Sequence, residues 1–149
     1  MKLLGFDPGN AIGYGLMESM KMLHHGIASM AMLRDLIREA DVVIAEDFVL
    51  FAHKSDALRW NKFVPARVLG MIELICWEEN KPLHLQKSAE RTFFGGERTE
   101  KVSSVGNQRL RALGFWYSTP HERDAARHIL TYYRKTKDAD LHEALRKMR

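Results

Sequence analysis

Residues 2–17 read KLLGFDPGNAIGYGLM, and this stretch decides the fold. Residues 2–7 are a short apolar run that Pro8-Gly9 stops, which predicts a buried strand ending in a turn. A second strand is expected over 12–17 and a third over 22–28. The short connections between these strands predict an antiparallel meander.

A helix and a fourth strand are expected next. Apolar residues recur at helical spacing from Met32 to Ile37, which predicts a helix, and Ser29 just before it can act as the N-cap. Residues 41–46, DVVIAE, are a β-branched run that ends in an acid, which predicts a central strand parallel to the first. Strands and helices that alternate in this way predict an α/β fold with a mixed sheet.

The middle of the chain predicts a long helical stretch and the last strand. Over 55–79 the pattern is helical, and Pro65 either kinks the helix or restarts it. The second part of this stretch is apolar almost all round, so we expect it to be buried, in part against a second copy of the chain. A fifth strand is expected over 82–86, followed over 87–98 by a glycine-containing loop with room for one short helix.

Two further helices are expected in the last third of the chain. One covers 101–113 and ends at Gly114. The other starts at Thr119-Pro120-His121-Glu122, where threonine can cap the helix, proline fits the first position and glutamate completes a capping box. Residues 1–137 should then form one domain, and residues 138–149 a polar C-terminal tail with or without a last helix.

Length and composition predict a single globular domain. The 149 residues suit one hydrophobic core, and 46% hydrophobic with 28% charged residues is ordinary for a soluble protein. The single cysteine, Cys76, excludes an intrachain disulfide and a zinc site built from cysteines, and it fits a reducing compartment. No stretch approaches the roughly 18 apolar residues of a membrane-spanning helix, so we expect a cytoplasmic protein without a membrane partner.

Charge is divided unevenly along the chain. Residues 1–86 hold 9 Lys/Arg and 11 Asp/Glu, a net of −2, whereas residues 87–149 hold 14 and 8, a net of +6. A basic C-terminal half suits a polyanionic partner, most simply nucleic acid, although a solvated surface of lysine and arginine would give the same count.

Three acids stand at the ends of predicted elements. Asp7 ends the first strand, Glu46 ends the fourth, and Asp124 lies in the first turns of the last long helix, three residues after His121. If the two strands are neighbours, their carboxylates meet at one edge of the sheet and require a cation. Oxygen ligands suit Mg²⁺ or Mn²⁺, and two such ions about 3.5–4 Å apart can activate water at a phosphodiester. Each residue also has a structural alternative: a turn former at Asp7, a helix-dipole partner at Asp124, and an exposed helix start at His121.

The order of these motifs resembles one family. Gly5-Phe6-Asp7-Pro8-Gly9 followed by Gly13-Tyr14-Gly15 is similar to the opening motif of RuvC-type Holliday junction resolvases, members of the ribonuclease H-like superfamily. The stretch 43–46 resembles their second acidic strand, and 121–126 resembles their C-terminal acidic motif. The resemblance covers about residues 1–133, and the short chain looks more like phage-encoded members.

The resemblance implies a ribonuclease H-like fold with a five-stranded mixed sheet flanked by helices. It implies a homodimer that binds four-way DNA junctions and makes paired, symmetric nicks with two Mg²⁺ ions per active site, for which Mn²⁺ can substitute. By position, Asp7, Glu46 and Asp124 would ligate the ions, and His121 would be a fourth ligand or a proton carrier. If the protein is phage-encoded, its compartment is the cytoplasm of the bacterial host.

Further residues are candidates for DNA contact. Lys101 resembles the family's basic residue near the scissile phosphate and is counted as catalytic, whereas the family's other lysine falls near Glu90 or Arg91. Phe51 could wedge the junction, while Phe48 is better explained by core packing. The residues expected to contact DNA are Phe51, Lys87, Arg91, Arg98, Lys101 and Arg109.

Two rival functions stay open at this stage. The same carboxylates could cut other branched DNA or the RNA strand of an RNA–DNA hybrid. The chain could also be a junction-binding module that does not cut.

Overall fold

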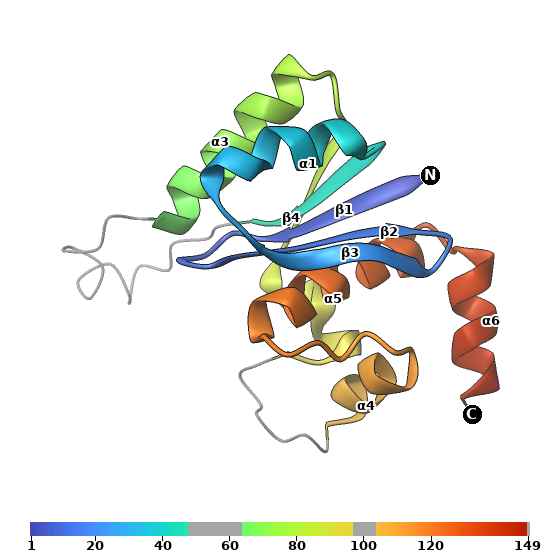
Figure 1. Cartoon of the computed structure of the whole chain (residues 1–149). Helices are drawn as coiled ribbons and strands as arrows, with labels where there is room; N and C mark the ends of the chain where they lie inside the picture. Colours follow the sequence, from blue (N-terminus) through green and yellow to red (C-terminus); the bar gives the residue numbers. More distant parts are fainter. Residues whose placement is uncertain (48–63, 97–103, 149) are drawn as a thin grey trace.

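The computed structural model describes residues 1–47, 64–96 and 104–148. Its five strands are β1 (Lys2–Asp7), β2 (Ile12–Glu18), β3 (Lys21–Ala28), β4 (Val42–Glu46) and β5 (Leu83–Gln86). They form one sheet in the order β3-β2-β1-β4-β5, with β1 in the middle (Figure 1). The predicted meander is confirmed, because β1 pairs antiparallel with β2, and β2 with β3. The predicted parallel pairing of β1 with β4 is confirmed too, and β5 extends it.

Helices cover both faces of the sheet (Figure 1). On one face lie α1 (Leu33–Glu39), preceded by the short 3-10 helix η1 (Met30–Met32), and α3 (Val64–Glu78). On the other face lie the 3-10 helix η3 (Ser88–Phe94), α4 (Val105–Ala112) and α5 (Pro120–Lys135). The last helix, α6 (Ala139–Lys147), packs against the end of α5. No helix in these described ranges is long and apolar enough to cross a membrane.

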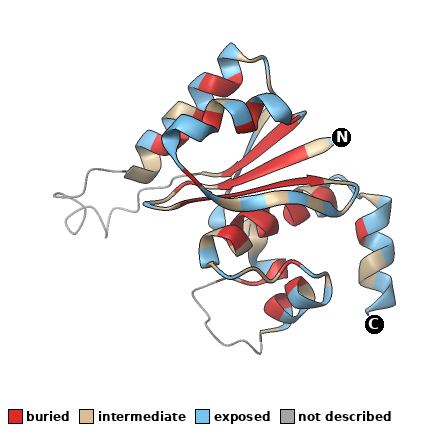
Figure 2. Cartoon of the chain, in the orientation of Figure 1, coloured by how far each residue is buried: buried red, intermediate tan, exposed pale blue. Residues whose placement is uncertain are grey.

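The sheet separates two hydrophobic cores because side chains alternate along each strand. In β1, Leu4 and Phe6 pack into the core under α1 and α3, whereas Leu3 packs into the core under α5. Figure 2 shows the buried residues gathered on the strands and on the helix sides that face them. The same alternation turns Gly5 and Asp7 toward α5.

The register between β1 and β4 brings two acids together. Phe6 pairs with Ala45 across the parallel ladder, so the residues that follow them, Asp7 and Glu46, stand at the same carboxyl end of the sheet. This is the edge at which open α/β sheets bind ligands.

Several element boundaries differ from the sequence-based expectation. Ser29 precedes η1, but its side chain makes no capping hydrogen bond. Helix α3 begins at Val64 with Pro65 in its first turn. Residues 55–63 lie outside the described ranges, so both alternatives for Pro65 stay predictions. The helix expected from residue 101 begins at Val105, because Ser104 is extended and its hydroxyl accepts a hydrogen bond from the amide of Asn107. Past this helix, Gly114 has a φ of 84°, a conformation suited to glycine.

The second part of α3 is buried on one side in the single chain, and the burial expected against a second copy stays a prediction. Val68, Leu69 and Ile72 pack into the core. On the other side of the helix, the side chains of Leu74 and Trp77 are 53% and 77% exposed. Among the described residues, α3 packs against α1 and shares a core with Leu4 and Phe6 of the sheet, so its contact is one-sided.

Candidate active site

Two glycines let α5 lie directly on β1, which carries Asp7, and on the neighbouring strand β2. A Cβ atom added to Gly5 would stand 2.5 Å from the carbonyl oxygen of Ala125. One added to Gly13, the partner of Asp7 in the β-ladder, would stand 2.2 Å from the carbonyl oxygen of His121. Both approaches are far inside van der Waals contact, so larger residues would push the helix away. The glycines of the opening motif therefore set how closely α5 approaches Asp7.

The start of α5 is fixed by its cap, as the sequence predicted. The Thr119 hydroxyl accepts a hydrogen bond from the amide of Glu122 at 3.2 Å, and the Glu122 carboxylate accepts one from the amide of Thr119 at 3.1 Å. Glu122 also contacts Nδ1 of His25 at 2.7 Å, and the His25 ring stacks on Tyr117 with 3.7 Å between centroids. These contacts tie the first turn of α5 to the edge strand β3.

Asp7 and His121 are in direct contact. His121 Nδ1 lies 2.8 Å from Asp7 Oδ2, and the Asp7 side chain is 16% exposed. Burial raises the pKa of Asp7, and the nearby carboxylates of Asp124 and Glu46 raise it further, while the His121 hydrogen bond and the charge of Arg91 oppose the rise. The three acids therefore act on one another electrostatically at this edge of the sheet.

Arg91 lies between two of the acids. Its Nη1 atom is 3.1 Å from Glu46 Oε2 and 2.5 Å from Asp124 Oδ2. Sequence reasoning assigned Arg91 to DNA contact; the structure places its guanidinium within the acidic site, with the side chain 13% exposed. A cation therefore already neutralises the two carboxylates.

A second arginine holds Asp124 from the protein interior. Arg127, one turn further along α5, forms an ion pair with Asp124 Oδ1 and is fully buried. Its Nε donates to the carbonyl oxygen of Phe94 at 3.2 Å, and its Nη2 donates to Asn107 Oδ1 at 2.9 Å. The position of Asp124 is thus locked to η3 and α4.

His128 positions Glu46 and was missed by the sequence analysis. It is fully buried, and its Nε2 lies 3.2 Å from Glu46 Oε2. Its Nδ1 lies 3.0 Å from Gln86 Oε1, and the Gln86 amide donates back to the carbonyl oxygen of His128 at 3.2 Å. Both ring nitrogens therefore lie within hydrogen-bond distance of an oxygen atom, and the two contacts fix the orientation of the ring. The available signal was spacing, because residue 128 follows Asp124 by four and shares its helix face.

The ionisation of Glu46 is set by these neighbours. Burial alone would raise the pKa of Glu46, but the hydrogen bond to His128 and the charge of Arg91 outweigh it, so its pKa is lowered. Glu46 is therefore an anion at neutral pH.

The donor chemistry of the site fits a hard divalent cation. Asp7, Glu46 and Asp124 offer carboxylate oxygens, the ligands that Mg²⁺ and Mn²⁺ prefer. Within the described ranges, no group of three such side chains surrounds a common point as ligands of a metal would. Arg91 instead lies beside Glu46 and Asp124, so a metal ion would bind there in exchange for its guanidinium.

The remaining predicted residues lie elsewhere. Lys87 is exposed just before η3. Phe51, Arg98 and Lys101 lie outside the described ranges, as does Phe48. Glu90 forms an ion pair with Lys135.

Arginines stacked on aromatic rings gather on the α5 side of the sheet. The guanidinium groups of Arg109 and Arg134 each lie 4.0 Å from the centre of the Phe93 ring. Those of Arg111 and Arg123 lie 4.2 and 4.6 Å from the centre of the Trp116 ring. Stacking of this kind holds the positive charges in place, which suits a surface that meets phosphates.

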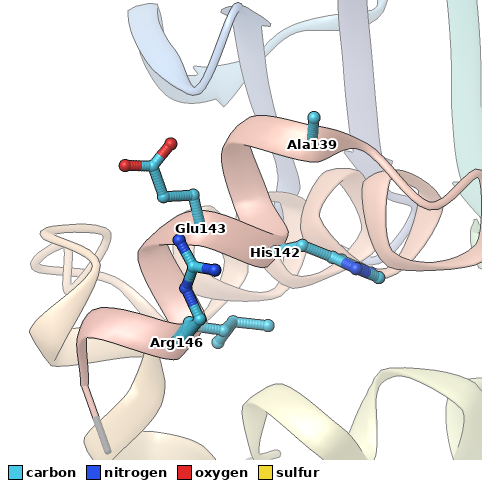
Figure 3. Close-up of a pocket in the computed structure, with 5 residues that line it drawn as sticks. Ala139, His142, Glu143 and Arg146 are labelled. Carbon is cyan, nitrogen blue, oxygen red and sulfur yellow. The ribbon is translucent and has the colours of Figure 1, made fainter.

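A separate hollow borders α6. It measures about 630 Å³ and is lined by Ala139, His142, Glu143, Leu145 and Arg146 (Figure 3). None of these residues belongs to the acidic site, so the hollow has no part in its chemistry.

Comparison with known proteins identifies the fold. No protein-family model matches the chain, and no curated protein matches it. The structure of Thermus thermophilus RuvC is similar, with a TM-score of 0.64 at 16% sequence identity, over 92% of this chain and 97% of that one. A second structure, T. thermophilus RuvC in complex with a Holliday junction substrate, gives a TM-score of 0.63 at 16% identity, over 91% of this chain and 96% of that one. The predicted ribonuclease H-like fold, a five-stranded mixed sheet flanked by helices, is confirmed, and it is RuvC-like.

Proposed function

We propose that this protein is a metal-dependent endonuclease that resolves four-way DNA junctions. The observation that carries the proposal is the placement of Asp7, Glu46 and Asp124 at one edge of a RuvC-like sheet. A RuvC of this fold has been solved in complex with a Holliday junction substrate, which supports the substrate class.

The site residues have distinct roles in this proposal. Asp7, Glu46 and Asp124 hold Mg²⁺ or Mn²⁺, and His128 and Arg127 keep Glu46 and Asp124 in place. Two bound ions would make a water nucleophilic and neutralise charge at the scissile phosphate. His121, joined to Asp7 through Nδ1, is the candidate fourth ligand or proton carrier.

Substrate binding is assigned to the basic side of α5. The stacked arginines, with Lys87, lie on the elements around the acids and would contact phosphates without reading sequence. Arg98 and Lys101 are proposed to add phosphate contacts, Lys101 at the scissile phosphate, and Phe51 to wedge the junction. Their test is the loss of junction affinity or cleavage in the single alanine variants.

A homodimer would supply the two cuts. The exposed Leu74 and Trp77 on α3 are the surface proposed to meet the second copy. Large apolar side chains of this kind are typical of interface cores. Two copies related by a two-fold axis would nick symmetric strands of the junction.

We further propose a phage-type protein that acts in the cytoplasm of the bacterial host.

The test is cleavage of a synthetic four-way junction in Mg²⁺ and in Mn²⁺. The wild-type protein should make paired, symmetric nicks, whereas Asp7→Asn should bind the junction and leave it uncut. Asp35→Asn, an exposed carboxylate on α1, is the matched control and should cut like the wild type. Cleavage by Asp7→Asn at the wild-type rate would show that the acids do not carry the reaction.

A binding module without nuclease activity is the second candidate. The contact of Arg91 with Glu46 and Asp124 favours it, because an arginine fixed there would exclude a metal ion. This alternative predicts junction binding with no cleavage in either ion.

A fork and an RNA–DNA hybrid in the same cleavage assay test the remaining substrates. Much faster cleavage of either one than of the four-way junction would identify it as the preferred substrate.

A further inference from the structure

The two arginines at Asp124 are held in very different ways. Arg127 is fully buried, and its guanidinium donates to Phe94 and Asn107 as well as pairing with Asp124. Arg91 is held differently: besides the two acids, its side-chain hydrogen bond among the described residues is to the hydroxyl of Ser88, at 3.3 Å, three residues earlier on the same 3-10 helix. Arg127 is therefore part of the framework, whereas the described part of the chain anchors the Arg91 guanidinium at the acids and at Ser88 alone.

The contact that Arg91 makes with the acids is one of charge. Its Nη1 lies within ion-pair distance of Glu46 and Asp124, yet this buried atom makes no well-directed hydrogen bond. Attraction between charges depends on distance far more than on direction, so another cation at the same place would satisfy the two carboxylates equally well. A divalent cation carries twice the charge and favours the same oxygens.

We infer that Arg91 is an exchangeable counter-cation that competes with the divalent metal ion for Glu46 and Asp124. The inference rests on the proposed metal site and adds a positioning residue to it. When a metal ion binds, the guanidinium leaves the two carboxylates; when none is bound, it keeps them from repelling each other and Asp7. Metal affinity is therefore set partly by the cost of displacing Arg91.

The test measures Mn²⁺ binding by calorimetry, without DNA. Arg91→Gln removes the competing charge, so its Kd for Mn²⁺ should be about tenfold lower than that of the wild type. Arg91→Lys keeps a charge and should fall between the two. Arg146→Gln is the control, since this exposed arginine on α6 pairs with none of the three acids; its Mn²⁺ affinity should equal that of the wild type.

Thermal unfolding gives an independent readout. In the presence of a chelator, Arg91→Gln should unfold at a lower temperature than the wild type, and Mn²⁺ should raise its melting temperature by more. Equal or weaker Mn²⁺ binding by Arg91→Gln would overturn the inference while leaving the nuclease proposal intact. Absence of Mn²⁺ binding in every variant would overturn both the inference and the metal dependence, whereas failure of the wild type to cut a junction would bear only on the proposed function.

A measurement on the wild type covers the case in which Arg91→Gln does not fold. The Nε–Hε resonance of Arg91, assigned by its loss in Arg91→Lys, should move during a titration with Mg²⁺ as the guanidinium leaves the acids. A resonance that stays in place while Mg²⁺ saturates the site would overturn the inference.

Discussion

Replacing Gly13 with alanine should damage both the fold and the site. The added Cβ would stand 2.2 Å from the carbonyl oxygen of His121 and 2.7 Å from its Cβ. An ordinary C···O contact is about 3.3 Å, so the first turn of α5 would have to move by about 1 Å. His121 and Asp124 both lie in the first two turns of this helix, whereas Asp7, opposite Gly13 on the neighbouring strand, would stay in the sheet.

Two magnitudes follow from this displacement. Overpacking of this kind costs about 2 kcal/mol, which lowers the melting temperature of a chain this long by roughly 6 °C. A misplacement of about 1 Å between catalytic groups reduces the rate about 100-fold. Thermal unfolding followed by circular dichroism and single-turnover cleavage of a four-way junction measure the two effects separately.

Gly70→Ala is the matched control. Gly70 lies in the middle of α3, and a Cβ placed there would meet nothing within 4 Å. Alanine is a better helix former, so this variant should be more stable by about 0.5–1 kcal/mol and should cut at the wild-type rate. Wild-type stability and cleavage in Gly13→Ala would refute the reasoning. Lower stability with an unchanged rate would show that the position of α5 does not set the geometry at Asp7.

Three further predictions concern the helix cap, pH and the dimer. Thr119→Ala should lower the free energy of unfolding by about 1 kcal/mol in urea denaturation, because the cap of α5 is lost; no change would contradict the capping role. Burial alone would raise the pKa of Glu122, but hydrogen bonds from Thr119 and His25 outweigh it, so the pKa is lowered in the folded protein. The ionised carboxylate therefore stabilises the fold at pH values above the pKa of an unfolded glutamate. This contribution is lost as the pH falls through the lowered pKa. Below about pH 4.3, the free energy of unfolding of Glu122→Gln should therefore fall less steeply with pH than that of the wild type. Parallel curves of unfolding free energy against pH would show that Glu122 does not cause the acid-induced loss of stability. Trp77→Glu should halve the mass measured by sedimentation and leave single nicks in place of pairs, whereas an unchanged mass would exclude α3 as the interface.

The sheet and its acids were predictable because their signals are local. The apolar runs at 2–7, 12–17 and 41–46 are each bounded by a turn or an acid, and each forms a strand to within one residue. Parallel pairing then places Asp7 and Glu46 at one edge, as expected for neighbouring strands. The start of α5 was equally clear, since the capping box is a short pattern.

The basic residues of the site were not predictable in the same way. Arginine is mostly exposed in proteins, so neither Arg91 nor Arg127 is expected to turn inward. The two acids that pair with Arg91 come from β4 and α5. Asp124 is only three residues from Arg127, but the other partners of Arg127, Phe94 and Asn107, come from η3 and α4. His128 was within reach of spacing arguments, but its second partner, Gln86, comes from β5.

The ladder between β1 and β4 also limits how the gene can vary. An insertion or deletion of one residue within either strand would turn its terminal carboxylate to the face under α1 and α3, where it would meet an apolar core. The length of the segment joining β3 to β4 is not constrained in this way, because it can change while Phe6 still pairs with Ala45. Related chains should therefore tolerate length changes in their connections and none in these two strands.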